Sequence, residues 1–188
     1  MRMGVCGGSR MNSDATNLYL VGFMGTGKST VGRLVAKQMD FDFIDSDQEI
    51  ERVQGKPVSA IFAEQGEPAF RKLEREFVEQ GHPAQGCVVA CGGGLVVPPG
   101  MIELLRSRGI VICMHAPIET IIDRILHTTH RPLLHVEDPA KRLRELYAQR
   151  EPLYRRTGTM VLTDSRPLKE IAAHVLRVYR QELSQTKK

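Results

Sequence analysis

Short apolar runs alternate with amphipathic segments along almost the whole chain. The apolar runs are rich in Val, Ile and Leu and end at polar residues, which predicts buried β-strands. These strands are expected at residues 18–21, 41–45, 87–90, 110–114 and 160–162. The segments between them repeat apolar residues every three or four positions, which is typical of helices. We expect helices at residues 30–37, 46–53, 59–65, 68–78, 101–105, 117–125, 140–154 and 167–183. The alternation predicts an α/β fold, with a five-stranded parallel sheet in a three-layer αβα arrangement.

Glycine, proline and small polar residues indicate where individual helices begin and end. Ser46 and Glu49 have the spacing of a capping box, which predicts a helix start at Ser46. Gly66 is expected to end one short helix, and Pro68 to open the next.

The 188 residues suffice for one domain with a substantial core. We find no internal repeat and no linker, so a single domain is expected at residues 17–184. Residues 1–16 are expected to form a disordered extension. The polar, proline-containing stretch at about residues 128–138 is expected to be a lid, with a plain surface loop as the alternative.

Composition excludes several classes of function. The net charge of +4 suits anionic small molecules, and the low aromatic content of 5% leaves no base-stacking platform for nucleic acid. No apolar run approaches the length of a membrane span, and residues 1–17 lack the apolar stretch of a secretory signal, so we expect no such signal there. The four cysteines form no C-x-x-C pair and read as buried thiols in a reducing compartment, so we expect a cytoplasmic protein. His127, His130 and His135 cluster in the polar stretch, where a metal site is the less favoured reading.

The stretch from Gly22 to Ser29 fits the phosphate-binding loop (P-loop) pattern G-x-x-x-x-G-K-[ST] at every fixed position. It follows a predicted strand and opens a predicted helix, which is the context that the motif requires. Backbone N–H groups ahead of a helix N-terminus bind anions, and the glycines let the backbone approach the ligand. Lys28 can therefore reach the β- and γ-phosphates of a nucleotide, and the Ser29 hydroxyl can bind Mg²⁺.

Two further groups follow predicted strands, where ligands bind in parallel sheets. Asp45 could act on the Mg²⁺ shell, and Asp47 could orient or deprotonate an acceptor hydroxyl. Helix capping explains the same two acids equally well. Three glycines, Gly92, Gly93 and Gly94, either admit a ligand close to the backbone or form a tight turn.

Three arginines are candidate anion ligands. Arg71 and Arg150 lie on predicted helices and could bind a carboxylate, although lone helix arginines are usually solvated. Arg131, in the expected lid, could neutralise charge on the transferring phosphoryl group. The guanine-reading Asn-Lys-x-Asp motif of GTPases is absent, as are the H-R-D and D-F-G signatures of protein kinases.

Taken together, these motifs resemble those of the shikimate kinases in order and separation. The resemblance extends from Asn17 to Leu183 and rests on six segments. They are residues 22–30, Asp45-Ser-Asp47, Gly66-Glu-Pro-Ala-Phe-Arg71, Gly92–Gly94, Arg131-Pro-Leu-Leu and Arg150-Glu-Pro-Leu-Tyr154. It implies a P-loop NTPase fold like that of the nucleoside-monophosphate kinases. It also implies transfer of the ATP γ-phosphoryl group to the 3-hydroxyl of shikimate, on the route to chorismate and aromatic amino acids.

The resemblance also implies roles for individual residues. ATP would be held by Gly25, Thr26, Gly27, Lys28, Ser29 and Thr30, with Arg124 near the adenine and Arg131 at the phosphates. Shikimate would be held by Asp47, Arg71, Gly92, Gly93, Gly94 and Arg150, with the two arginines facing its carboxylate. Lys28, Asp47 and Arg131 would be the catalytic residues.

The sequence departs from the pattern of the family at the expected metal site. No acidic residue ends the strand at 87–90, so Mg²⁺ would rest on Ser29, with Asp45 acting through water. Another P-loop kinase of small molecules, such as a gluconate kinase, is one alternative, and a regulatory module that binds ATP without transferring it is the other. Without an exposed heptad seam, a monomer is expected.

Overall fold

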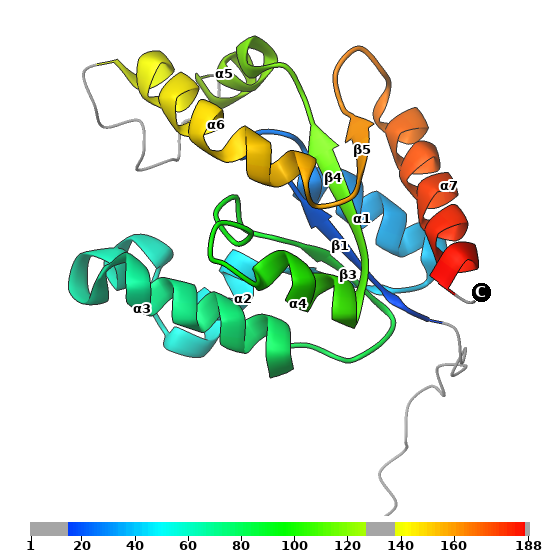
Figure 1. Cartoon of the computed structure of the whole chain (residues 1–188), viewed down its shortest axis with the longest axis horizontal. Helices are drawn as coiled ribbons and strands as arrows, with labels where there is room; N and C mark the ends of the chain where they lie inside the picture. Colours follow the sequence, from blue (N-terminus) through cyan, green and yellow to red (C-terminus); the bar gives the residue numbers. More distant parts are fainter. Residues whose placement is uncertain (1–14, 127–137, 187–188) are drawn as a thin grey trace, which may run out of the picture.

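A five-stranded parallel sheet runs through the centre of the computed structural model, which describes residues 15–126 and 138–186. Its strands are β1 (Asn17–Val21), β2 (Asp42–Asp45), β3 (Cys87–Ala90), β4 (Gly109–His115) and β5 (Thr159–Leu162). They lie in the order β2-β3-β1-β4-β5, so β1 is central (Figure 1). The predicted α/β class and the five strands are confirmed.

The central strand pairs with two strands that lie far along the chain. Leu18 is level with Val88 of β3 on one side and with Ile110 of β4 on the other. No residue of β1 is more than 1% exposed. Asn17 belongs to this strand, and its side chain accepts a hydrogen bond from the Cys87 N–H and donates one to the Pro83 carbonyl, both 2.9 Å long.

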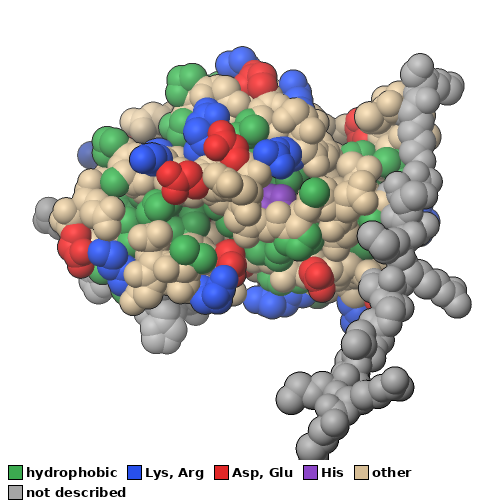
Figure 2. All heavy atoms as spheres, turned by 90° about the horizontal axis from the view of Figure 1, so that it is seen from below, with side chains coloured by type: hydrophobic (Ala, Val, Ile, Leu, Met, Phe, Trp, Pro, Cys, Tyr) green, Lys and Arg blue, Asp and Glu red, His purple; other side chains and the backbone are tan. Residues whose placement is uncertain are grey.

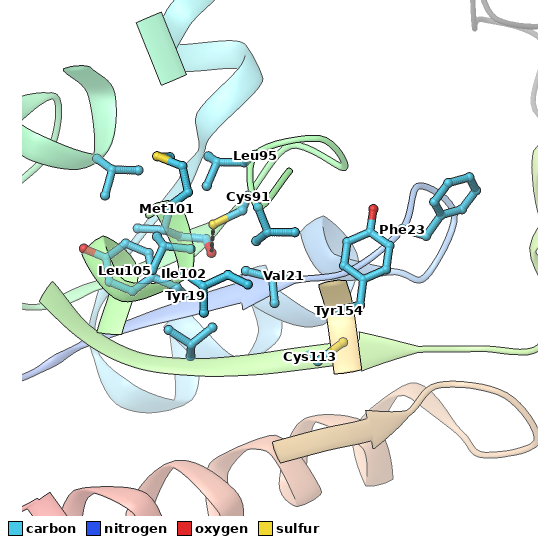
Figure 3. Close-up of a cluster of buried hydrophobic side chains, with 14 of the residues drawn as sticks. Tyr19, Val21, Phe23, Cys91, Leu95, Met101, Ile102, Leu105, Cys113 and Tyr154 are labelled. Atoms are coloured by element: carbon cyan, nitrogen blue, oxygen red, sulfur yellow. Dashed lines mark hydrogen bonds between the residues drawn. The ribbon is translucent and has the colours of Figure 1, made fainter. Parts of the chain in front are cut away.

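Helices cover both faces of the sheet, because successive strand residues point to opposite sides. On one face, α1 (Lys28–Met39) and α7 (Leu168–Thr186) pack on a cluster that includes Leu20 and Ile112. On the other face lie α2 (Ser46–Gln54), α3 (Val58–Gln80), α4 (Met101–Arg108), α5 (Ile118–Leu126) and α6 (Pro139–Arg155). Their core cluster contains Tyr19, Val21 and Phe23 (Figure 3).

The helix start expected at Ser46 is confirmed, but the residue that caps it differs from expectation. The capping box at Ser46 is wrong, because Asp45 is the N-cap of α2 and accepts bonds from the N–H groups of Asp47 and Gln48. Strand β2 leads directly into α2, which places the Asp45 carboxylate over the first turn and frees the Ser46 hydroxyl for another partner. The two helices expected at 59–65 and 68–78 are confirmed: both lie within α3, and the helical backbone is interrupted between them at Gly66, where φ is 79°.

Several expectations fall on parts of the chain that are not described. They are most of the extension at 1–16, nearly all of the lid at 128–138, the three histidines of that stretch, and Cys6. The other cysteines, Cys87, Cys91 and Cys113, are buried and unbridged as predicted. Among the described helices, none has the length and apolar character to cross a membrane. On the face seen in Figure 2, acidic and basic side chains are interspersed.

Candidate active site

A cleft of about 1120 Å³ opens at the carboxyl ends of the strands. Its lining contains every sequence-predicted site residue that the structure describes. These are Gly25, Thr26, Gly27, Lys28, Ser29, Thr30, Asp45, Asp47, Arg71, Gly92, Gly93, Gly94, Arg124 and Arg150. Arg131 lies outside the described residues.

The P-loop is curled tightly between β1 and α1. Gly22 has φ of 136°, and a Cβ there would lie 2.2 Å from the Met114 carbonyl oxygen, so only glycine fits. The Lys28 ammonium donates to the carbonyls of Gly22 and Phe23 at 2.8 and 2.9 Å. It thus lies over the start of the loop, beside the N-terminus of α1, where both charge and dipole attract an anion.

Asp45 connects the end of β2 to the first turn of α1. Its Oδ2 accepts a 2.7 Å hydrogen bond from the Ser29 hydroxyl, while its Oδ1 accepts from the Asp47 N–H at 3.2 Å. Both readings of Asp45 as a helix cap and as a site residue therefore have a structural basis. The hydroxyl and the carboxylate form an adjacent pair of hard oxygen donors, which is the donor type that Mg²⁺ prefers.

Asp47 places a buried carboxylate beside the glycine loop. Its Oδ1 has no hydrogen-bond partner among the described residues. A Cβ at Gly92 would lie 2.3 Å from this oxygen, so the glycine leaves the room that the carboxylate occupies. Burial and the neighbouring Asp45 raise the pKa of Asp47 to about 6, against the opposing effect of Lys28. Such a group is ionised at neutral pH and basic enough to accept a proton.

Arg71 is held by two glutamates of its own helix. Its guanidinium donates to Glu74 and to Glu67, each at 2.6 Å. A Cβ at Gly94 would lie 2.5 Å from the guanidinium nitrogens, so the glycine loop packs directly against them. The arginine is therefore oriented in advance toward the cleft rather than solvated.

Glu74 is a site residue that the sequence reasoning missed. Its side chain is 0% exposed, and its Oε1 has no hydrogen-bond partner among the described residues. Burial raises its pKa to about 7, although Arg71 acts in the opposite direction. The spacing of Arg71 and Glu74 on a predicted helix could have revealed it, because residues three apart share one helix face.

The glycine loop is bonded to two helices. The Gly92 N–H donates to the Ser46 hydroxyl at 2.8 Å, and the Gly93 carbonyl accepts from Arg150 at 3.4 Å and from the Tyr154 hydroxyl. The loop also makes a turn bond from the Leu95 N–H to the Gly92 carbonyl at 3.1 Å. The turn and ligand-site readings are thus compatible, and Tyr154 is a second residue that we had not predicted as part of the site.

Arg124 bridges the P-loop and the end of β5. Its guanidinium donates to the Gly25 carbonyl at 3.3 Å and to the Thr163 carbonyl at 2.6 Å. Arg124 is remote from Lys28 in the sequence, yet both side chains line the same cleft.

Comparison with known proteins decides the family. A model of the shikimate kinase family matches residues 24–180. The chain belongs to the shikimate kinase family. A shikimate kinase of Caldanaerobacter subterraneus subsp. tengcongensis is 44% identical over 163 residues, which span 87% of this chain and 95% of that relative. A shikimate kinase of Pseudomonas syringae pv. tomato is also 44% identical, over 85% of this chain and 94% of the relative.

Solved structures of shikimate kinases share the fold. The shikimate kinase from Acinetobacter baumannii in complex with shikimate superposes with a TM-score of 0.80 at 36% identity, over 89% of this chain and 94% of that one. A gluconokinase from Sinorhizobium meliloti superposes with a TM-score of 0.55 at 19% identity, over 91% and 97%, which is a likeness of fold alone. The P-loop kinase fold is confirmed, and membership of the shikimate kinase family makes the protein an ATP-dependent kinase.

Glu74→Gln isolates the effect of the buried carboxyl on stability. The pKa of Glu74 rises from 4.5 to about 7 on folding, so the native state binds the extra proton. The stability that this group contributes is complete below about pH 4.5 and is lost as the pH rises through about 7. Glutamine does not ionise. We expect wild type to lose about 1–3 kcal/mol of unfolding free energy relative to Glu74→Gln between about pH 5 and pH 8, measured by urea unfolding.

Glu76→Gln is the matched control on the same helix. The Glu76 side chain is 49% exposed, so its difference from wild type should stay nearly constant with pH. A difference for Glu74→Gln that is equally flat would show that Glu74 does not gain a proton on folding.

Proposed function

We propose that this cleft transfers the γ-phosphoryl group of ATP to the 3-hydroxyl of shikimate, giving 3-phosphoshikimate and ADP. The observation that carries the proposal is the convergence of P-loop, Asp47, Arg71, the glycine loop and Arg150 on one cavity. The family membership and the shikimate-bound relative from A. baumannii support the same acceptor.

In this proposal the nucleotide phosphates occupy the P-loop. The backbone amides from Gly25 to Thr30 bind phosphate oxygens, and the Lys28 ammonium turns from the Gly22 and Phe23 carbonyls toward the β- and γ-phosphates. Arg124 lies beside the adenine. Arg131, which lies outside the described residues, would neutralise charge on the transferring phosphoryl group.

Ser29 and Asp45 would hold Mg²⁺, with Asp45 acting through water. Their oxygens are 2.7 Å apart, and this donor set fits a hard cation that keeps several waters. When bound, the ion supplies neutralisation of charge on the phosphate oxygens. The two residues keep that charge next to Lys28 and at the N-terminus of α1.

The acceptor occupies the other end of the cleft in this proposal. Arg71 and Arg150 bind the shikimate carboxylate, because a planar guanidinium matches a carboxylate in shape and charge. Gly92, Gly93 and Gly94 let the ring come close to the backbone. Asp47 then accepts a hydrogen bond from the attacking hydroxyl through its unpartnered Oδ1 and takes the proton as the phosphoryl group transfers.

We further propose a cytoplasmic monomer. The three described cysteines are free thiols, which suits a reducing compartment.

Acceptor identity is tested by ADP release in a coupled assay. We expect release to depend on shikimate and to stay at background with gluconate, because gluconate offers no cyclic alcohol at the correct distance from a carboxylate bound by two arginines. Equal release with gluconate would contradict the shikimate assignment. No release with any hydroxy acid would favour the regulatory ATP-binding alternative.

Asp47→Asn removes the base while keeping the shape of the side chain. We expect turnover to fall by about 10²- to 10⁴-fold while ATP binding, measured by calorimetry, survives. Asp42→Asn is the matched control, since Asp42 is exposed at the opposite end of β2. Near-normal turnover of Asp47→Asn would exclude the proposed role.

Arg71→Ala and Arg150→Ala test recognition of the carboxylate. Loss of a charge-assisted hydrogen bond should raise the shikimate KM by about 10- to 100-fold and change the ATP KM far less. Arg75→Ala, one turn beyond Arg71 on α3, should leave both values near wild type, because Arg75 pairs with Glu79. Equal effects on both substrates would argue against the carboxylate role.

A further inference from the structure

Tyr154 contacts both the glycine loop, at Gly93, and the P-loop, at Phe23, and it lies on the same helix as Arg150. It lies near the C-terminal end of α6, four residues after Arg150, and its side chain is buried at 3% exposure. Its hydroxyl donates a hydrogen bond to the Gly93 carbonyl, which also accepts from the Arg150 guanidinium at 3.4 Å. One backbone oxygen of the glycine loop therefore fixes two successive turns of α6.

The hydroxyl is not needed to fill the core, because phenylalanine would supply the same ring. Burial raises the pKa of the Tyr154 phenol, so the group stays a neutral donor over the working pH range. Its partner belongs to a loop 61 residues away in sequence rather than to its own helix. The bond thus sets the position of the loop relative to α6, and with it the position of Arg150.

The ring of Tyr154 contacts the P-loop as well. It packs edge-on against Phe23, with ring centroids 6.4 Å apart and an interplanar angle of 73° (Figure 3). The Phe23 carbonyl in turn accepts hydrogen bonds from the Lys28 ammonium at 2.9 Å and from the Thr26 hydroxyl at 2.8 Å. A shift of α6 would therefore displace the Phe23 backbone, whose carbonyl orients Lys28.

The glycine loop also contacts the P-loop directly. A Cβ at Gly93 would lie 3.3 Å from the Met24 amide nitrogen, so this loop and the P-loop are in close contact. Packed elements of this kind move together, because protein interiors are dense and compress little.

We propose that Tyr154 is a positioning residue that couples the acceptor site to the nucleotide site. It holds the Gly93 carbonyl and Arg150 in the arrangement that receives the acceptor carboxylate, and its ring transmits that arrangement to the P-loop through Phe23. The inference rests on the proposed role of Arg150 in carboxylate binding. Its consequence is that the Tyr154 hydroxyl contributes to affinity for the acceptor without touching the reacting atoms.

Tyr154→Phe removes only the hydroxyl. We expect the shikimate KM to rise by about three- to tenfold, as for the loss of one hydrogen bond, with kcat and the ATP KM within about twofold of wild type. Tyr147→Phe is the matched control, because Tyr147 lies on the same helix and packs on the same Phe23 at 5.4 Å between ring centroids. Its hydroxyl contacts His115 instead of Gly93, so neither KM should change.

A second variant tests the transmission to the P-loop. Phe23→Leu keeps the Tyr154 hydroxyl and removes the ring contact, and shikimate binding is measured by calorimetry with and without ADP. We expect any change in shikimate affinity caused by ADP to be reduced at least twofold relative to wild type. Coupling equal to that of wild type in both Phe23→Leu and Tyr154→Phe would overturn the coupling role.

The outcomes separate the inference from the proposed function. An unchanged shikimate KM in Tyr154→Phe overturns the inference, and so does a uniform loss of kcat and of both affinities with a lowered Tm, which is the pattern of a merely structural hydroxyl. Arg150→Ala is measured in the same assay. If Arg150→Ala leaves the shikimate KM unchanged, the carboxylate role itself fails. If it raises the KM while Tyr154→Phe does not, only the inference fails.

Discussion

This cleft must hold several positive charges close together before any substrate binds, and the rest of the site depends on how that is achieved. Lys28 is held by two backbone carbonyls, and Arg71 by two carboxylates, Glu67 and Glu74. Each cation is thereby fixed in direction, and its repulsion for the others is offset locally. An incoming anion then meets groups that are already oriented, which lowers the entropy cost of binding. Burial raises the pKa of Glu74, and the Arg71 guanidinium acts in the opposite direction by favouring its ionised form.

Strand order brings these groups together. Strands β2, β3 and β1 are neighbours in the sheet and run parallel, so their carboxyl ends lie side by side. Asp45 ends β2, Gly92 follows β3 and the P-loop follows β1. Helices α2 and α1, which come directly after β2 and the P-loop, carry Asp47 and Lys28, and α3, between α2 and β3 along the chain, carries Arg71. Helix α6 then covers the glycine loop with Arg150 and Tyr154. The active site is therefore a product of parallel topology, in which distant segments share one edge.

Local patterns in the sequence were enough to predict the strands and the P-loop, because each depends on periodicity or on a motif with a fixed spacing. The two arginines were singled out by the resemblance to the shikimate kinases, since a lone arginine on a helix is usually solvated. The error at Ser46 arose where two acceptable caps, Asp45 and Ser46, adjoin, and only the path of β2 decides between them. Glu74 was missed because a charged residue on an amphipathic helix normally faces solvent. Tyr154 looked like an ordinary core aromatic, since its bonding partner, Gly93, is remote in the chain. Strand order also depends on such remote contacts, so sequence patterns alone did not predict it.

The central position of β1 in the sheet has a consequence for folding during synthesis on the ribosome. Leu18 emerges early, yet its partners Val88 and Ile110 belong to strands made much later. A lone parallel strand has no hairpin neighbour with which to pair while it waits. The P-loop therefore stays without its folded support until β3 and β4 have been synthesised, and the apolar strand β1 depends in that interval on shielding from aggregation.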